Sequence, residues 1–311
     1  MKTYALTLFM IFSTFFCFSQ TAREFAEMAA KKAEAKDYKY ALIMIDKAIA
    51  KNDTNQWYRL AKADIEFKLY GPREAIKTSL AAIAVNRKNS ECYNRAGMYY
   101  NSAGINDSAV YFYNLAIKFA ANDTTKHMYI LNRGTAKNDV RDFDGAKADY
   151  EIALQFNPND IATLNNIAAI YSELGMQQKG IAALKKIISI DKTFIGPYVN
   201  LGFIYSELDS LDLSISYFDK ALLINAQDPL TYSNRGHVYY KKGNYNAALK
   251  DINYSISLYP TNSYAYRNLA LVYIATKKRS EACDALKYAV DYGFEKMYGD
   301  EVNELIKKHC K

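Results

Sequence analysis

Small residues return every 34 positions from residue 134 onward, and this spacing is the strongest constraint in the sequence. They are Gly134, Ala168, Gly202, Gly236 and Ala270, and tyrosine follows four of them three positions later, at Tyr171, Tyr205, Tyr239 and Tyr273. A second series of small residues lies twelve positions after the first, and a large apolar residue follows each of its members four positions later. These couples are Ala146 with Tyr150, Gly180 with Leu184, Ser214 with Phe218, Ala248 with Ile252, and Ala282 with Leu286.

The two series predict that each 34-residue unit is an antiparallel pair of helices. Small residues let two helices approach closely, and the large residues fill the space between them. Glycine at Gly175 and Gly243 falls where the chain must turn between the helices. Pro158 and Pro260 follow second helices, where proline can end a helix without removing a needed donor. Half of the residues are apolar, so the chain has ample material for a packed core.

This period and residue pattern resemble the tetratricopeptide repeat family. The seventh unit carries the family pattern at Tyr232, Gly236, Tyr239, Ala248, Ile252 and Pro260, and the fourth carries it at Gly134, Ala146, Tyr150, Ala153 and Pro158. The resemblance implies an all-α, right-handed superhelical solenoid of about eight antiparallel helix pairs. Arg95, Arg133 and Arg235 depart from the pattern, because the family usually buries leucine at that position.

A stack of such repeats needs polar ends, and the sequence predicts a C-terminal capping helix. We expect three segments: a signal peptide at 1–19, the solenoid at 20–291 and the cap at 292–311. In the cap, Asp300 suits an N-cap, and Glu304 and Lys308 have the spacing of an ion pair. We expect the capping helix to pack antiparallel on the preceding helix.

That packing would bring Cys310 beside Cys283 and predicts a disulfide. Closing this loop would stabilise the fold by about 3 kcal/mol. Two independent thiols are the alternative, since disulfide geometry is strict. Cys92 falls on the packed side of a first helix, and we expect it to be a buried apolar thiol.

The first 20 residues, MKTYALTLFMIFSTFFCFSQ, have the layout of a secretory signal. The apolar run from Tyr4 to Phe18 is shorter than the roughly 20 residues that cross a bilayer as a helix. We therefore expect cleavage before Gln20, export to the periplasm or the cell exterior, and no membrane span afterwards. An uncleaved signal that anchors the chain in the membrane is the alternative.

The sequence offers little support for catalysis or cofactor binding. His127, His237 and His309 lie far apart along the predicted solenoid, and no phosphate-binding loop, catalytic-serine motif or zinc motif is present. We expect no enzymatic activity, no cofactor and no metal site. The net charge of +7 is spread along the chain, so we expect no nucleic-acid partner. Lysines at predicted turns, such as Lys277 and Lys278, are interpreted as solvated.

Asparagine also recurs every 34 residues, at one position of the first helices. The series is Asn132, Asn166, Asn200, Asn234 and Asn268, and Asn94 joins it when the third unit is aligned on its Asn-Arg pair. In the family the first helices line a concave groove, and in some relatives such asparagines bind the backbone of an extended peptide. A carboxamide suits this because it offers a donor and an acceptor. Hydrogen bonding within each repeat is the competing interpretation, and both stay open.

The family geometry also predicts which neighbouring residues line the groove. They include Val199, Phe203, Ser233, His237, Tyr240, Arg267, Leu271 and Ile274. This apolar and aromatic lining favours a protein or extended-peptide partner. We therefore expect a protein-binding scaffold. One alternative is an accessory factor for envelope assembly or secretion that docks by its convex face or its ends. A glycan-binding or hydrolytic protein is another, and it would need paired carboxylates beside aromatic platforms.

Overall fold

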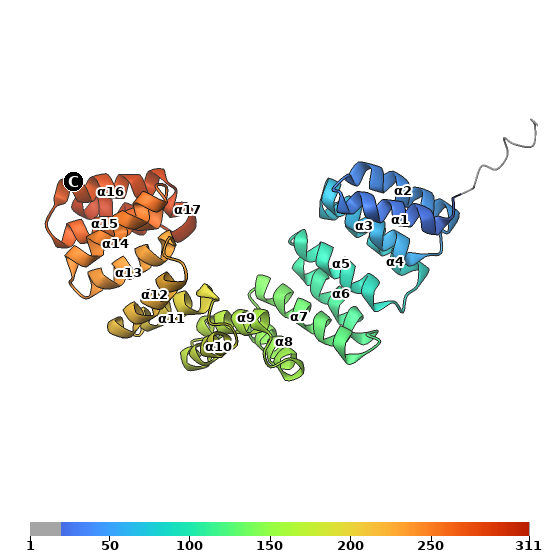
Figure 1. Ribbon diagram of the computed structural model, residues 1–311, viewed down its shortest axis with the longest axis horizontal. Helices are drawn as coiled ribbons and strands as arrows, with labels where there is room; N and C mark the ends of the chain where they lie inside the picture. The colour runs from blue at the N-terminus through green and yellow to red at the C-terminus, as the bar shows by residue number, and fades with distance from the viewer. Residues whose placement is uncertain (1–19, 311) are drawn as a thin grey trace, which may run out of the picture. The chain divides into compact units, whose positions relative to one another are not determined.

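In the computed structural model, residues 20–310 are described, and the predicted signal peptide at 1–19 lies outside them. The described chain is helical and contains no strand between residues 20 and 310. The chain divides into two compact units, Met1–Phe156 and Asn157–Lys311, which are named unit 1 and unit 2. Figure 1 shows that consecutive helices in each unit run side by side as pairs.

The described part of unit 1 contains four helix pairs. They are α1 (Ala22–Glu34) with α2 (Tyr38–Lys51), α3 (Gln56–Tyr70) with α4 (Pro72–Val85), α5 (Ser90–Ser102) with α6 (Asn106–Lys118), and α7 (Asp123–Asp139) with α8 (Phe143–Phe156). Unit 2 contains four more pairs and two short terminal helices. They are α9 (Ile161–Glu173) with α10 (Gln177–Ile190), α11 (Ile195–Glu207) with α12 (Leu211–Ile224), α13 (Pro229–Lys241) with α14 (Tyr245–Leu258), α15 (Ser263–Ala275) with α16 (Arg279–Asp291), α17 (Phe294–Tyr298) and α18 (Glu301–His309). The eight predicted pairs are confirmed.

The small residues of the first series make the close approach that their spacing predicts. A Cβ atom on Gly202 would lie 2.7 Å from the Phe218 ring, and one on Gly236 would lie 2.6 Å from the Ile252 side chain. Phe218 and Ile252 are almost fully buried as a result. Each small residue of a first helix therefore receives the large residue found 16 positions later on its partner helix.

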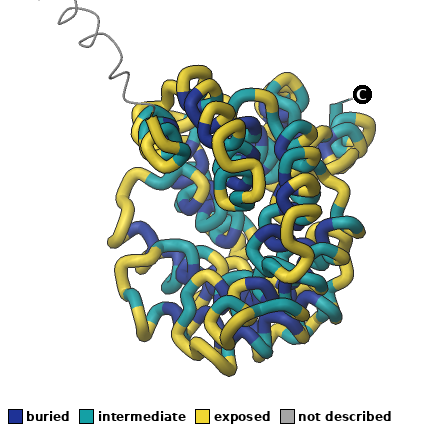
Figure 2. Tube along the Cα trace, turned by 90° about the vertical axis from the view of Figure 1, so that its right-hand side faces the viewer, coloured by how far each residue is buried: buried dark blue, intermediate teal, exposed yellow. Residues whose placement is uncertain are grey.

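Local signals set the helix starts and the turns. Asp160 and Asp228 cap α9 and α13, where their carboxylates accept backbone N–H hydrogen bonds at 2.9 and 2.8 Å. In unit 2 the turn inside each pair uses one residue of positive φ, and these residues are Gly175, Asp209, Gly243 and Lys277. Figure 2 shows that most turns are exposed while buried residues lie along the helices.

The C-terminal cap differs from the prediction in one respect. Within 292–311 one helix was expected, with Asp300 at its N-cap; α18 begins at that position, and the short helix α17 precedes it. Gly293 and Gly299, both at positive φ, precede and follow α17 and separate it from its neighbours. α18 packs on α16, as predicted, and buries Val302 completely.

A disulfide joins α16 to the end of α18. The Sγ atoms of Cys283 and Cys310 are 2.02 Å apart, and the bond closes a loop with a sequence separation of 27. Cys92 is a free and buried thiol, and burial raises its pKa to about 11. The thiolate of Cys92 is therefore scarce near neutral pH, which suits a packing role.

Candidate functional site

The predicted asparagine series in unit 2 lies on the first helices of its four pairs. Asn166 is on α9, Asn200 on α11, Asn234 on α13 and Asn268 on α15. We call the side of these four helices that carries Asn166, Asn200, Asn234 and Asn268 the first-helix face. The four side chains occupy equivalent positions, but their surroundings differ.

Asn268 is a correction to the prediction, because it is fully buried. Its Nδ2 donates to the Ser233 hydroxyl at 3.1 Å and to the Ser233 carbonyl at 3.3 Å. Its Oδ1 accepts from Arg267 at 2.9 Å. Ser233, which was expected to line the groove, is fully buried too. Both side chains hold α15 against α13 and are unavailable to a ligand.

Asn166, Asn200 and Asn234 keep their carboxamides free. None of the three forms a hydrogen bond with another residue of the described chain, 20–310. Asn200 is exposed, and Asn166 and Asn234 are partly exposed. Asn268 bonds to Ser233 on the preceding first helix. The equivalent residue on the first helix before Asn234 is Val199, and valine has no polar side-chain atom. Three successive repeats thus present unused donors and acceptors to solvent.

Phe203 lies between two small pockets on this face. Its side chain is 52% exposed. A pocket of about 150 Å³ is lined by Ala168, Ala169, Ser172, Leu184, Asn200, Phe203 and Ile204. A second pocket, of about 30 Å³, is lined by Phe203, Ser206, Glu207, Phe218, Asn234, His237, Val238 and Tyr264. Each pocket therefore combines Phe203 with one of the free asparagines.

His237 borders the smaller pocket as a neutral side chain. Burial, followed by the positive charges of Arg267 and Lys241, lowers the pKa of His237 to about 4. Its Nδ1 lies 3.4 Å from Arg267 Nη1, and its ring centroid lies 5.8 Å from that of Tyr240. Tyr240 in turn contacts the ring of Tyr245 on α14 at 6.2 Å. His237 therefore lines this pocket, and Tyr240 packs against the His237 ring beside it.

Arg267 has a different role from the predicted one. Its guanidinium forms an ion pair with Glu301 on α18, where Nε lies 3.1 Å from both carboxylate oxygens. It also bonds Asn268 and lies 5.6 Å from the centre of the Tyr264 ring. With 13% of its side chain exposed, Arg267 joins α15 to the C-terminal helix and leaves little surface for a ligand.

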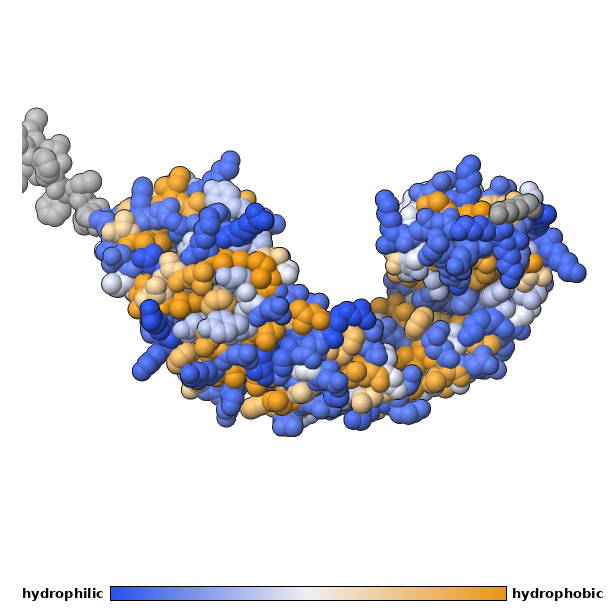
Figure 3. Space-filling model, turned by 180° about the vertical axis from the view of Figure 1, so that it is seen from behind, coloured by the Kyte–Doolittle hydropathy of each residue, from blue (hydrophilic) through white to orange (hydrophobic). Residues whose placement is uncertain are grey.

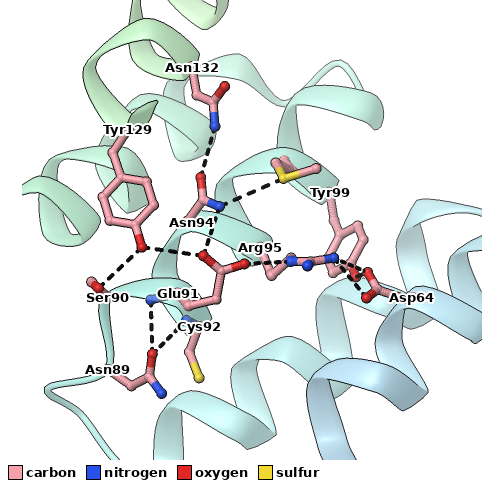
Figure 4. A network of polar contacts seen from close by, with 11 residues as sticks. Asp64, Asn89, Ser90, Glu91, Cys92, Asn94, Arg95, Tyr99, Tyr129 and Asn132 are labelled. Atoms are coloured by element: carbon pink, nitrogen blue, oxygen red, sulfur yellow. Dashed lines mark hydrogen bonds and ion pairs between the residues drawn. The ribbon is translucent and has the colours of Figure 1, made fainter. Parts of the chain in front are cut away.

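In unit 1 the asparagine series serves the fold. Figure 4 shows the contact in which Asn132 on α7 donates from Nδ2 to Asn94 Oδ1 on α5. The two atoms are 2.9 Å apart, and Asn94 is only 3% exposed. Glu91 accepts from Asn94, from Tyr129 and from Arg95 in the same network. These two asparagines therefore bond inside the fold, but their bond joins two successive repeats and does not lie within one repeat, as the competing interpretation expected.

The three arginines at the family's leucine position form ion pairs between helices. Arg95 binds Asp64 on α3 at 2.6 Å, and Figure 4 draws this contact. Arg133 binds Asp149 on α8 at 2.6 Å, and Arg235 binds Asp251 on α14 at 2.7 Å. These ion pairs were not predicted from the sequence. The signal was present in the repeat spacing, because Arg133 and Arg235 each lie 16 residues before their aspartate.

An aromatic pocket in unit 1 bears on the hydrolytic alternative. A cavity of about 450 Å³ is lined by Trp57, Asn86, Lys88, Asn89, Ser90, Glu91, Phe119, Ala121, Thr125 and Tyr129. Trp57 is 56% exposed, so an aromatic platform is present. Glu91 is the single carboxylate among these lining residues, and Arg95 already pairs with it at 2.7 Å. The pocket lacks the second carboxylate that acid and base catalysis of glycoside hydrolysis needs.

Residues 20–310 contain no cluster of three or more histidine, cysteine or acidic side chains with metal-binding geometry. Over the same range, none of the helices has the length and apolar character that a membrane span requires.

Comparison with known families supports the repeat assignment. Models described as tetratricopeptide repeat match residues 161–194, 195–228 and 229–262, which correspond to the pairs α9/α10, α11/α12 and α13/α14. No curated protein matches the chain. The matched windows cover three consecutive pairs of unit 2, including the three free asparagines.

Solved structures resemble the fold over most of the chain. A tetratricopeptide repeat protein from Parabacteroides merdae ATCC 43184 is similar at 17% identity and a TM-score of 0.66, covering 82% of this chain and 99% of that one. PilW, a type IV pilus biogenesis factor, is similar at 17% identity and a TM-score of 0.58, covering 65% and 92%. The APC/C hetero-tetramer Cut9–Hcn1 is similar at 15% identity and a TM-score of 0.58, covering 91% and 55%. At these identities the likeness concerns the fold.

Proposed function

The chain belongs to the tetratricopeptide repeat proteins, and we propose that it is a protein-binding scaffold whose unit 2 binds an extended peptide on its first-helix face. One observation carries the proposal. Asn166, Asn200 and Asn234 expose carboxamides that no other residue of the described chain engages, on three successive helices of equivalent position. An unused, solvent-facing amide at a repeated position is available to a partner.

The geometry of an extended chain suits this arrangement. Packed helices lie about 8–10 Å apart, and an extended peptide rises about 3.3 Å per residue. Asparagines on successive first helices would then meet the peptide about every third residue. Each carboxamide can donate to a backbone carbonyl and accept from a backbone N–H. Such contacts tolerate many peptide sequences.

Phe203 supplies the selectivity of the proposed site. Its half-exposed ring separates the two pockets, which lie beside Asn200 and Asn234. An apolar side chain of the peptide would bury the ring and fill the larger pocket, whose volume of about 150 Å³ suits a leucine or phenylalanine side chain. Aromatic anchors of this kind carry much of the affinity of an interface. The partner we propose is an extended segment with one large apolar residue.

Two further parts of the proposal concern location and chemistry. We place the protein outside the cytoplasm, because the first 19 residues have a signal-peptide layout and Cys283 is joined to Cys310. An uncleaved signal that holds the chain at the membrane is the alternative. We also propose that the protein acts by binding and not by catalysis, as tetratricopeptide repeat proteins typically do.

Photo-cross-linking tests the site of binding. Short peptides selected from a displayed random library on the mature protein serve as probes. Benzoylphenylalanine placed at Phe203 should cross-link to a selected peptide on irradiation. The same group placed at Leu223, which is 86% exposed on the second helix α12, is the control and should give little product. Equal yields from the two positions, or product from Leu223 alone, would contradict binding on the first-helix face.

A further inference from the structure

A basic cavity at the C-terminal end of unit 2 is separate from the first-helix asparagines. It has a volume of about 390 Å³ and is lined by Ile274, Lys277, Arg279, Ala282, Lys308 and His309. These residues come from the end of α15, the following turn, the start of α16 and the end of α18. Three of the six are permanently cationic, one is histidine and none is acidic.

The cations of this cavity are not neutralised by the fold. Lys277, Arg279 and Lys308 form no ion pair with any residue in the described range 20–310. The sequence predicted that Lys308 would pair with Glu304 four residues earlier, and this pair is not formed. Lys308 lines the cavity instead. Hydrophilic side chains also dominate the C-terminal end of unit 2 in the view of Figure 3.

Two structural features hold these charges together. The turn between α15 and α16, in which Lys277 has a positive φ, places Lys277 next to the start of α16. Lys308 and His309 immediately precede Cys310, whose disulfide to Cys283 fixes the end of α18 on α16. Lys277, Arg279 and Lys308 are exposed, so solvent screens much of their mutual repulsion, and a bound anion between them would be attracted most strongly at low ionic strength.

We propose that this cavity binds a small multivalent oxyanion, a molecule that carries two or more phosphate or carboxylate groups. A cavity of about 390 Å³ exceeds the size of a single phosphate and falls within the range of small-molecule sites. Arg279 offers a planar fork that pairs with two oxygens of one group, and the lysines act as point charges for the others. Ile274 and Ala282 supply an apolar wall.

Titration calorimetry at low ionic strength tests the proposal with two probes, inorganic pyrophosphate and citrate. We expect the oxidised protein to bind at least one of them, and the preferred probe identifies the phosphate or the carboxylate class. Lys308→Glu and Arg279→Glu should each weaken binding by about tenfold, because each removes a charge-assisted contact and adds repulsion. Arg279→Ala provides a milder variant if Arg279→Glu does not fold.

Matched controls separate a defined site from a general effect of charge. Lys307→Glu makes the same change of charge as Lys308→Glu, one residue earlier on α18, and Lys287→Glu makes it on α16. Neither Lys307 nor Lys287 lines the cavity. Both variants should retain the affinity of the parent within about twofold. Failure of the parent to bind either probe, or an equal loss in Lys307→Glu and Lys308→Glu, would overturn the proposal.

The disulfide provides a second and independent arm of the test. Cys283→Ser combined with Cys310→Ser frees the end of α18 and should weaken binding of the preferred probe by about tenfold, because Lys308 and His309 lose their fixed position. Circular dichroism would establish that the helices remain. Unchanged affinity in this variant would remove α18 from the site and contradict the proposal as stated.

Discussion

Arg235 on α13 donates two hydrogen bonds to the carboxylate of Asp251 on α14, from Nε at 2.7 Å and from Nη2 at 2.9 Å. Arg133 and Asp149 make the same contact in unit 1, at 2.9 and 2.6 Å. Asp251 is 5% exposed and Asp149 is 2% exposed, so both carboxylates need a nearby cation; Arg235 supplies it for Asp251, and Arg133 shares this role with Lys137 at Asp149. The arginine thus replaces leucine packing with a buried ion pair between the helices of one repeat.

Replacing Arg235 by leucine, the residue that the family usually has there, should destabilise the protein. The change leaves Asp251 buried beside an apolar side chain, and we expect the free energy of unfolding to fall by about 2–4 kcal/mol. Chemical denaturation followed by circular dichroism measures the change. Arg279→Leu is the control, because Arg279 has no ion pair in the described chain, and it should have little effect. An Arg235→Leu variant as stable as the parent would refute the assigned role.

The turn residues of unit 2 give a second prediction. Asp209 has a φ of 54°, a conformation that costs an ordinary residue free energy and costs glycine much less. Asp209→Gly should therefore raise the melting temperature, by a stabilisation of about 0.5–1 kcal/mol. Gly243→Ala at the equivalent turn, where φ is 75°, should lower it by a destabilisation of about 1 kcal/mol. Shifts of the same sign in the two variants would contradict this account of the turns.

The fold could be predicted largely from spacing, and the site only in part. The helix pairs follow from the couples of small and large residues 16 positions apart, such as Gly202 and Phe218. The same spacing relates Arg235 to Asp251, but an ion pair needs both partners to face one another, and the spacing alone does not establish their burial. The surroundings of each asparagine could not be predicted from the spacing, because equivalent positions have different neighbours. Asn268 meets Ser233 and is buried, whereas Asn234 has Val199 in the corresponding place and stays free.

His237 predicts a pH dependence of stability in the acid range. Its pKa is lowered from 6.5 to about 4 in the folded protein, so the unfolded chain takes up a proton at a higher pH than the folded one. Protonation then favours unfolding, and stability should fall as the pH drops from about 6.5 to about 4. The contribution is up to about 3 kcal/mol.

Denaturation curves of the parent and of His237→Gln, measured at several pH values across this range, isolate the effect. Glutamine cannot take up the proton, so the variant should lose less stability on acidification than the parent. The difference between the two proteins removes the contribution of other groups that titrate in both. Parallel curves across the whole range would show that His237 is not the neutral, partly buried group described above.

The disulfide should contribute to stability through its loop. Cys283→Ser combined with Cys310→Ser removes a cross-link with a sequence separation of 27, and we expect a loss of about 3 kcal/mol in the free energy of unfolding. Hydrogen exchange should also become faster in α18, which loses its attachment to α16. Cys92→Ala is the control that alters a thiol outside the cross-link and should leave exchange in α18 unchanged. Equal protection of α18 with and without the disulfide would contradict this prediction.

The proposal that the free asparagines bind a peptide backbone is tested most directly by the affinity of one library-selected peptide for two variants. The first changes Asn166, Asn200 and Asn234 to alanine, and the second changes Asn246 and Asn253, which lie on the second helix α14, to alanine. Isothermal titration should give a loss of at least about tenfold for the first, because three hydrogen bonds are removed, and little change for the second. Equal affinity of the parent and the first variant, with both folded, would show that the peptide does not use these asparagines and would contradict the central claim.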